Sequence, residues 1–218
     1  MENPYRTERI IEARMKLKNR FEEKMQQTPS VADNRPMGSG KLNRHGMPVI
    51  PVGQTITQKW PVLDLGIQPV ISLNEWKLTV DGAVENAVTL SWNDFMELPQ
   101  TDDISDFHCV TTWSKLNIKW KGVRFLDLAA LVQPKENTTH IMCYGYDDYT
   151  TNLSLVEALK PDVLLAHTAE GKPLEKEHGG PVRMITPQLY AWKGSKWINR
   201  IEFLTRNRLG FWEERGYS

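Results

Sequence analysis

The sequence has few of the features that define several common classes of protein. It contains two cysteines, Cys109 and Cys143, in 218 residues, which is too few for the disulfide framework of a small secreted domain. Basic residues equal acidic residues, 27 against 27, so electrostatics give no reason to expect nucleic acid as the main partner. No apolar run is long enough to cross a bilayer, and we expect no membrane span.

Targeting and nucleotide-binding motifs are also missing. The N-terminus, MENPYRTERIIEARMKLKNR, has neither the apolar core of a secretory signal nor a twin-arginine pair, and we therefore expect a cytoplasmic protein. A glycine-rich phosphate loop of either nucleotide-binding type is not found. Zinc is disfavoured as well, because the sequence contains no Cys-x-x-Cys or His-x-x-x-His pair.

What remains is the composition of a globular protein, with 40% apolar and 25% charged residues. Near the N-terminus, the periodicity from Thr7 to Met25 predicts an amphipathic helix with Thr7 as its N-cap and Arg14 on its polar face. A stretch rich in Pro, Gly, Ser and Asn follows and predicts a linker. We therefore divide the chain into an N-terminal helix with its linker, residues 1–47, and a single globular domain, residues 48–218.

The domain has the pattern of a mixed α+β fold. Strand-like stretches alternate irregularly with short helical ones, and the regular long crossover helices of a doubly wound parallel sheet are missing. Ser91 with Asp94, and Ser154 with Glu157, have the spacing of capping boxes that begin short helices. FLDLAALV predicts a further helix, and strands are predicted at EWKLTVDGAV, HIMCYGY, PVRMIT and WINRIEFLT.

Cys109 lies in the stretch DFHCVTTWSK, and the residues alone leave four interpretations open. His108 is adjacent, but neighbouring residues of an extended strand point to opposite faces, which argues against a direct thiol–imidazole pair. A zinc site lacks further ligands at a recognisable spacing. A single thiolate can also hold a soft metal whose other ligands come from an organic cofactor. A buried cysteine that only fills space is the most frequent case, and we keep that interpretation for Cys143.

A second group of polar residues lies in HGGPVRMITPQLYAWKGSKWINRIEF, which contains His178, Arg183, Lys193 and Lys196. Arginine offers a planar fork of donors and lysine a mobile point charge, so the group suits an anion such as a phosphate. A solvated basic loop is the alternative. The spread of these residues over two predicted strands and a Gly194–Ser195 turn favours a pocket.

Taken in order, these stretches resemble a known family. DDYTTNLSL and EHGGPVRMITP…WKGSKWI follow the pattern CVTTWS…W.G, which is carried by Cys109, Trp113, Ser114, Trp120 and Gly122. From about Trp76 to Phe203 the sequence is similar to the sulfite oxidase family of molybdopterin-dependent oxidoreductases. The Cys-Val-x-x-Trp-Ser pattern resembles in particular the short branch that contains the catalytic subunit of the periplasmic methionine sulfoxide reductase.

The resemblance implies a mixed-sheet, sulfite-oxidase-type molybdopterin-binding fold and a set of site residues. Cys109 would be the sole protein ligand of molybdenum, next to two sulfurs from the pterin dithiolene. Tyr149 would reach the metal-bound oxygen as a catalytic residue. The resemblance places the remaining contacts to the cofactor and its phosphate at His178, Arg183, Gly194, Ser195 and Lys196.

The resemblance also implies a function, a molybdenum-cofactor-dependent oxidoreductase that transfers an oxygen atom to or from a small-molecule substrate. Without a haem or flavin motif the enzyme would need an external redox partner. Sulfite specificity is not implied, because the arginine-rich stretch of the sulfite oxidases is replaced by VTTWSKLN, which contains only Lys115. The family's C-terminal dimerisation domain has no counterpart, and we expect a monomer or weak oligomer. The alternative is a non-catalytic protein that binds or carries the cofactor.

Overall fold

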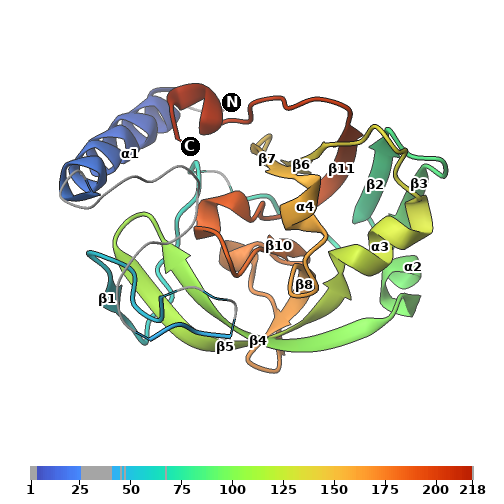
Figure 1. The fold of residues 1–218 in the computed structure, drawn as a ribbon, viewed down its shortest axis with the longest axis horizontal. Coiled ribbons are helices and arrows are strands. Elements are labelled where there is room, and N and C mark those ends of the chain that lie inside the picture. The colour runs from blue at the N-terminus through green and yellow to red at the C-terminus, as the bar shows by residue number, and fades with distance from the viewer. Residues whose placement is uncertain (1–3, 26–40, 45, 47, 67, 218) are drawn as a thin grey trace.

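The computed structural model describes residues 4–25, 41–44, 46, 48–66 and 68–217. Two β-sheets form the body of the protein, and helices lie around them (Figure 1). Residues 26–40, most of the predicted linker, lie outside the described residues. Within the described part of the chain, no helix combines the length and the apolar character needed to span a bilayer.

The first sheet has six strands and is organised around one long strand, β5. On one edge of β5 lies β4, its antiparallel partner, and on the other edge lie β1, which is parallel to it, and β8, which is antiparallel. β8 in turn pairs with β9 and β10. The strands are β1 (Thr55–Ile56), β4 (Gln100–Cys109), β5 (Trp113–Arg124), β8 (Leu164–Ala169), β9 (Lys172–Pro173) and β10 (Arg183–Ile185).

The second sheet has five strands in the order β3-β2-β11-β6-β7, and it is mixed because β2 runs parallel to β11 while the other pairs are antiparallel. Its strands are β2 (Lys77–Gly82), β3 (Val88–Ser91), β6 (His140–Gly145), β7 (Thr150–Ser154) and β11 (Ile198–Leu204). Two mixed sheets with short helices confirm the predicted α+β class.

The helices follow local sequence signals closely. α3 (Phe125–Val132) covers the predicted FLDLAALV, and Ser91 with Asp94 forms the complete capping box that begins α2 (Trp92–Glu97). At α4 (Leu155–Ala158), the Ser154 side chain accepts a hydrogen bond from the Glu157 backbone N–H. The short 3₁₀ helices are η1 (Lys176–His178), η2 (Ala191–Lys193) and η3 (Glu213–Arg215). The main apolar core lies between the two sheets, where Trp76, Val123, Phe125, Leu165 and Phe203 are buried.

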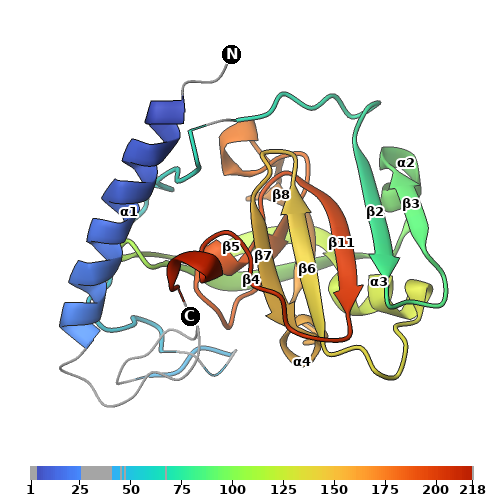
Figure 2. The same cartoon turned by 90° about the horizontal axis from the view of Figure 1, so that it is seen from above.

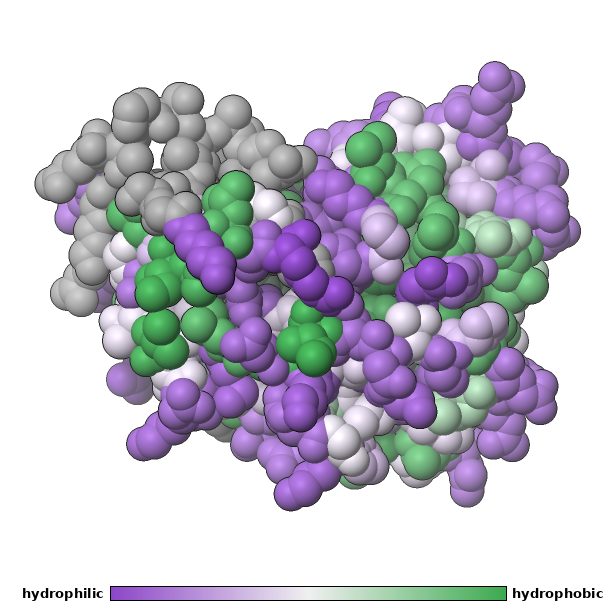
Figure 3. Space-filling view, turned by 60° about the horizontal axis from the view of Figure 1, so that its bottom comes forward, coloured by the Kyte–Doolittle hydropathy of each residue, from purple (hydrophilic) through white to green (hydrophobic). Residues whose placement is uncertain are grey.

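Helix α1 (Pro4–Met25) folds back onto the body of its own chain. Thr7 is not its N-cap, because the helix begins at Pro4. Ile11 and Met15 pack against a small cluster formed by Leu65, Tyr149 and Trp212. Figure 2 shows α1 alongside the C-terminal segment, on the side of the molecule away from β2 and β3. The face drawn in Figure 3 mixes hydrophilic side chains with small apolar patches.

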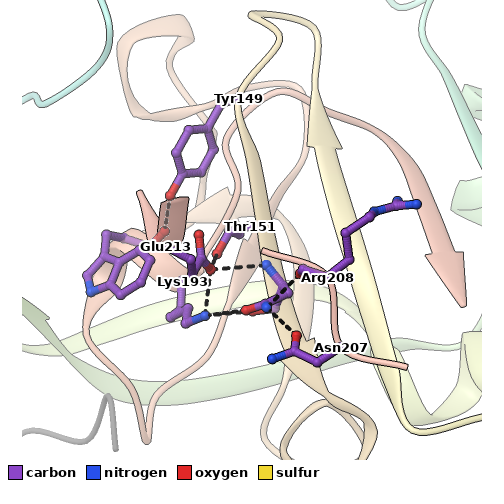
Figure 4. Close-up of polar contacts among 8 residues, drawn as sticks. Tyr149, Thr151, Lys193, Asn207, Arg208 and Glu213 are labelled. Atoms are coloured by element: carbon purple, nitrogen blue, oxygen red, sulfur yellow. Dashed lines mark hydrogen bonds and ion pairs between the residues drawn. The ribbon is translucent and has the colours of Figure 1, made fainter. Parts of the chain in front are cut away.

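A buried ion pair fastens the C-terminal segment to β7 (Figure 4). Lys193 Nζ lies 2.6 Å from Glu213 Oε1, and each of the two side chains is 5% exposed. The ammonium also donates to the Asn152 backbone and side-chain oxygens, at 2.9 and 2.6 Å. Thr151 Oγ1 donates to the same Glu213 oxygen at 2.8 Å. Burial lowers the pKa of Lys193, and Glu213 opposes that shift. Lys193 therefore has a structural role and is not part of the anion-binding group proposed from the sequence.

We expect Glu213→Gln to lower the free energy of unfolding by about 3–5 kcal/mol, because the buried Lys193 ammonium loses the charge that compensates it. Urea denaturation measures the change. Glu214→Gln is the matched control, because the neighbouring carboxylate is exposed and its loss should cost less than about 0.5 kcal/mol. Adding Lys193→Met to Glu213→Gln should recover part of the loss. Equal free energies of unfolding for Glu213→Gln and Glu214→Gln would contradict a stabilising role of Glu213 toward Lys193.

Candidate active site

A cleft of about 730 Å³, including its open mouth, lies between the tip of the β4–β5 hairpin, the segment around Trp60, the η2–β11 turn and α1. Cys109, Tyr149, His178, Arg183, Gly194 and Lys196, predicted from the sequence, all line this cleft, whereas Ser195 and Lys193 do not. Cys109, Tyr149 and Arg183 come from three separate strands or turns, so only the folded chain brings them together.

Cys109 is the last residue of β4 and pairs with Trp113, the first residue of β5. The intervening residues form the tight turn of a β-hairpin, in which Thr112 has a positive φ of 72° and its N–H donates to the Cys109 carbonyl at 3.0 Å. The Gln54 side-chain amide donates to the same carbonyl at 2.9 Å. The turn and this amide together fix the position of the thiol in the cleft.

The Cys109 side chain is buried, at 6% exposure, and its Sγ lies 3.1 Å from Thr111 Oγ1. Burial raises the pKa of the thiol. The hydrogen bonds from Thr111 and the positive charges of Arg14 and Lys196 lower that pKa. A soft ligand atom therefore sits in a protected place among cations, a setting that favours its anionic form once a metal replaces the proton.

His108 does not act on the Cys109 thiol. It is buried but does not line the cleft, whereas Phe107 and Cys109 on either side of it do. Its Nδ1 lies 2.8 Å from Ser114 Oγ, and burial lowers the pKa of His108 to about 4. The alternation of side chains along an extended strand, which the sequence indicated, separates the two residues.

Arg183 and His178 form one wall of the cleft together with Trp60. The His178 ring stacks on Trp60 with centroids 3.8 Å apart and planes 8° apart. Arg183 is 2% exposed, donates to the His178 carbonyl at 2.9 Å, and lies 5.0 Å from the centre of the Phe107 ring. Burial lowers the pKa of Arg183 to about 10, so the guanidinium stays charged at neutral pH.

The turn between η2 and β11 carries the three residues predicted to hold a phosphate. Gly194 lines the cleft, and a Cβ added to it would meet the Met184 carbonyl oxygen at 2.4 Å, so the close packing of this turn requires glycine. Ser195 is fully buried, and its hydroxyl donates to the Lys196 carbonyl at 3.3 Å. Ser195 is thus part of the turn's interior and presents no side chain to the cleft.

Lys196 reaches the cleft and is held there by the backbone. Its Nζ donates to the Glu177 carbonyl at 2.6 Å and lies 4.9 Å from the centre of the Trp197 ring. Burial, and after it the charge of Arg183, lowers the pKa of Lys196 to about 7. The ammonium of Lys196 is therefore the charge in this cleft that changes most near neutral pH.

Tyr149 lines the cleft with its ring, but its hydroxyl is already engaged. The hydroxyl donates to the Trp192 carbonyl at 2.6 Å, and the side chain belongs to the same apolar cluster as Trp212. Burial raises the pKa of Tyr149, so the phenol stays protonated. In this conformation the Tyr149 hydroxyl donates its only proton to the backbone, so toward a ligand its oxygen can act only as a hydrogen-bond acceptor.

Several cleft residues were missed by sequence reasoning. Trp60 and Asp64 lie in the 54–66 stretch, which shows no recognisable motif, and Asp147 begins the quoted DDY run without a role being assigned to it. Burial raises the pKa of Asp147 to about 6. Arg14, placed on the polar face of the predicted helix, instead lines the cleft. No local signal distinguishes it from the other charged residues of α1, because only the docking of the helix selects it.

Comparison with known proteins decides the family. Residues 65–212 match the model of the oxidoreductase molybdopterin binding domain. The chain belongs to this family. It is a molybdopterin oxidoreductase of the sulfite oxidase type. It is 39% identical over 169 residues to the uncharacterized oxidoreductase YuiH of Bacillus subtilis, a match that covers 77% of this chain and 85% of that protein.

Other relatives in the family are longer than this chain. The catalytic subunit MsrP of the protein-methionine-sulfoxide reductase of Campylobacter jejuni is 30% identical, over 63% of this chain and 52% of its own. The mitochondrial sulfite oxidase of Drosophila melanogaster is 27% identical, over 68% and 30%. The crystal structure of the sulfane dehydrogenase SoxCD of Paracoccus pantotrophus shares the fold, with a TM-score of 0.60 and 22% identity, over 64% of this chain and 40% of that one. The chain thus spans only about half of MsrP.

We expect the cofactor-free protein to bind sulfate less tightly as the pH rises from about 6.5 to about 8.5, by roughly 10-fold, because Lys196 loses its proton in this range and a charge-assisted hydrogen bond is worth about 1.5–3 kcal/mol. Sulfate keeps its charge over the same range. Calorimetric titration at several pH values measures the affinity.

Lys196→Arg is the matched control, because a guanidinium stays charged throughout. Its sulfate affinity should lose most of the pH dependence. Asp147 has a pKa of about 6, so its carboxylate becomes negatively charged near the acid end of this range and also weakens sulfate binding there. This contribution is the same in the wild type and in Lys196→Arg. An unchanged slope in Lys196→Arg would contradict the role of Lys196.

Proposed function

We propose that the protein binds molybdenum-molybdopterin in this cleft and uses it to transfer an oxygen atom to or from a small substrate. One observation carries the proposal. The single cysteine in the cleft is buried beside cations, and the residues that surround it are those that a dithiolene-bound metal and a phosphate require. Cys109 would be the protein's ligand to the metal, and Arg183, His178, Gly194 and Lys196 would hold the pterin and its phosphate.

The donor groups of the cleft support this cofactor. Arg183 Nε and the indole N–H of Trp113 are buried and have no hydrogen-bond partner among the described residues, and both side chains line the cleft. Buried donors are rarely left unpaired, so a ligand rich in acceptor atoms is the natural partner for both. The stacked rings of Trp60 and His178 add a flat apolar wall that suits a planar ring system.

When bound, the cofactor supplies a two-electron redox change that accompanies oxygen-atom transfer. The chain contributes position and environment. The β-hairpin turn fixes Cys109, the buried aromatic walls exclude water, and the cations balance the negative charge of thiolate and phosphate. Tyr149 lies within the same wall and would place its hydroxyl oxygen near the reacting group.

An external redox partner completes the proposal. The sequence contains no haem or flavin motif, so electrons would be exchanged with another molecule. We also propose that the enzyme acts in the cytoplasm as a monomer or weak oligomer.

The first test is the metal and pterin content of protein purified from a host that makes molybdenum cofactor. We expect near one molybdenum and one pterin per chain by elemental mass spectrometry and by fluorescence of the oxidised pterin. Cys109→Ser should lose one sulfur neighbour in the molybdenum X-ray absorption spectrum. Its turnover in a screen of sulfoxides, N-oxides and sulfite should fall by about 100-fold or more.

Cys143→Ala is the control, because this second thiol is buried in the main core and does not line the cleft. It should keep the sulfur count and the turnover of the wild type and lose only stability. Unchanged sulfur count and turnover in Cys109→Ser would rule out the proposed ligation, and wild-type protein without molybdenum or pterin would rule out the proposed function.

A non-catalytic carrier of the cofactor is the second candidate, and the engagement of the Tyr149 hydroxyl with the Trp192 carbonyl favours it. Tyr149→Phe separates the two. If the hydroxyl takes part in turnover, the rate should fall by about 10-fold or more while the pterin content stays that of the wild type. Tyr146→Phe removes a hydroxyl that bonds the Lys77 backbone instead and should leave the rate unchanged. Equal rates in both variants would contradict a catalytic Tyr149.

A further inference from the structure

Helix α1 lies outside the residues that match the family domain, yet it forms part of the cleft. The matched residues are 65–212, and α1 spans Pro4–Met25. Ile11 and Met15 anchor the helix on the Tyr149 cluster. The Tyr217 hydroxyl donates to the Arg14 carbonyl at 3.1 Å, which ties the helix to the C-terminal segment. These contacts place the Arg14 side chain in the lining of the cleft.

The guanidinium of Arg14 keeps most of its hydrogen-bonding capacity. Its Nη2 donates to the Asp64 carbonyl at 3.3 Å. The Asp64 carboxylate, which also lines the cleft, accepts instead from the Gly66 N–H and the Gln68 amide, each at 2.8 Å. Within the described part of the chain, Arg14 makes no ion pair with a carboxylate. A guanidinium has five N–H donors, so several remain for a ligand.

The other two cations of the cleft lie within residues 65–212, which match the family domain. Arg183 donates to the carbonyls of His178 and Gly194, and Lys196 donates to the carbonyl of Glu177. Both therefore belong to the wall that the proposed function assigns to the cofactor. Arg14 enters from α1, with its charge still acting on Cys109 and Lys196. Arg14 is half-buried, and the cofactor contacts of the proposed function do not include it.

We propose that Arg14 is a specificity-determining residue, which α1 delivers to the cleft so that its guanidinium binds a negatively charged oxygen group of the substrate next to the reacting centre. The inference rests on the proposed function and extends it to an element outside the family domain. The planar fork of a guanidinium matches two oxygens of one group, as in a carboxylate or a sulfur or phosphorus oxyanion. A neutral substrate would gain less from it.

The test uses the cofactor-loaded enzyme, in which the pterin already occupies its own phosphate site. Sulfate is the non-reacting anionic probe, and calorimetric titration gives its dissociation constant. For Arg14→Gln we expect this constant to rise about 10-fold or more, because a charge-assisted contact is lost. Arg14→Lys should recover part of the affinity. Arg9→Gln, the same change at an exposed position of the same helix, should leave the affinity unchanged.

Kinetics supply a second readout with two small probes, anionic sulfite and neutral dimethyl sulfoxide. For any probe that is turned over, Arg14→Gln should raise the KM for sulfite and leave the KM for dimethyl sulfoxide as it is in Arg9→Gln. Arg14→Gln and Arg9→Gln could have equal sulfate affinities while their molybdenum and pterin contents are also equal. This result would overturn the inference but not the proposed function. Loss of pterin in Arg14→Gln but not in Arg14→Lys or Arg9→Gln would assign Arg14 to the cofactor and overturn its role toward the substrate. Wild-type protein without molybdenum and pterin would overturn the proposed function and, with it, the inference.

Discussion

The burial of positive charge beside one thiol is the constraint on which the cleft depends. Arg183 is 2% and Lys193 4% exposed, and a buried cation without compensation costs several kcal/mol. The chain compensates Lys193 with a hydrogen-bonded carboxylate, whereas among the described residues Arg183 and Lys196 donate their hydrogen bonds to backbone carbonyls, and the charges of Asp64 and Asp147 act on Lys196 through space. Carbonyl oxygens accept part of these hydrogen bonds, leave Arg183 Nε without a partner among the described residues, and do not cancel the net charge. The cleft therefore keeps a positive field that an anionic cofactor or substrate can use, while the neighbouring core is neutral.

The segment from η2 to β11 contains two lysines with different roles, one in a buried ion pair and one in the cleft. Lys193 points to β7 and Glu213, whereas Lys196 reaches the cleft. Between them, Gly194 packs against the Met184 carbonyl at a distance that permits no side chain. The Tyr149 hydroxyl binds the carbonyl of Trp192, next to Lys193. The ion pair of the C-terminal segment thus supports the same turn that lines the cleft, so fold stability and the position of the site are coupled.

The sequence predicted those parts of the protein that depend on neighbours in the chain. The helix at Phe125–Val132 and the cap at Ser91 rest on local periodicity and on a side chain three residues away, and both are found. The family was predicted from the order of several motifs between Trp76 and Phe203, each of which is contiguous in the sequence. Roles that depend on distant packing were not predictable. Lys193 looked equivalent to Lys196 until Glu213, 20 residues further along, neutralised it, and the burial of Ser195 within its turn has no local signature.

Arg14 shows most clearly what such packing adds. In the sequence it is one of several charges on an amphipathic helix, and this helix lies outside residues 65–212, which match the family domain. Among the described residues, the apolar anchors Ile11 and Met15, the bond from Tyr217 and the bond to the Asp64 carbonyl hold it in place. The wall assigned to the cofactor comes mostly from residues of the family domain, with Trp60 just outside it, whereas Arg14 lies on a helix that flanks the domain. Under the proposed function, a substitution in α1 would therefore change substrate selectivity and leave the proposed metal ligand, Cys109, in place.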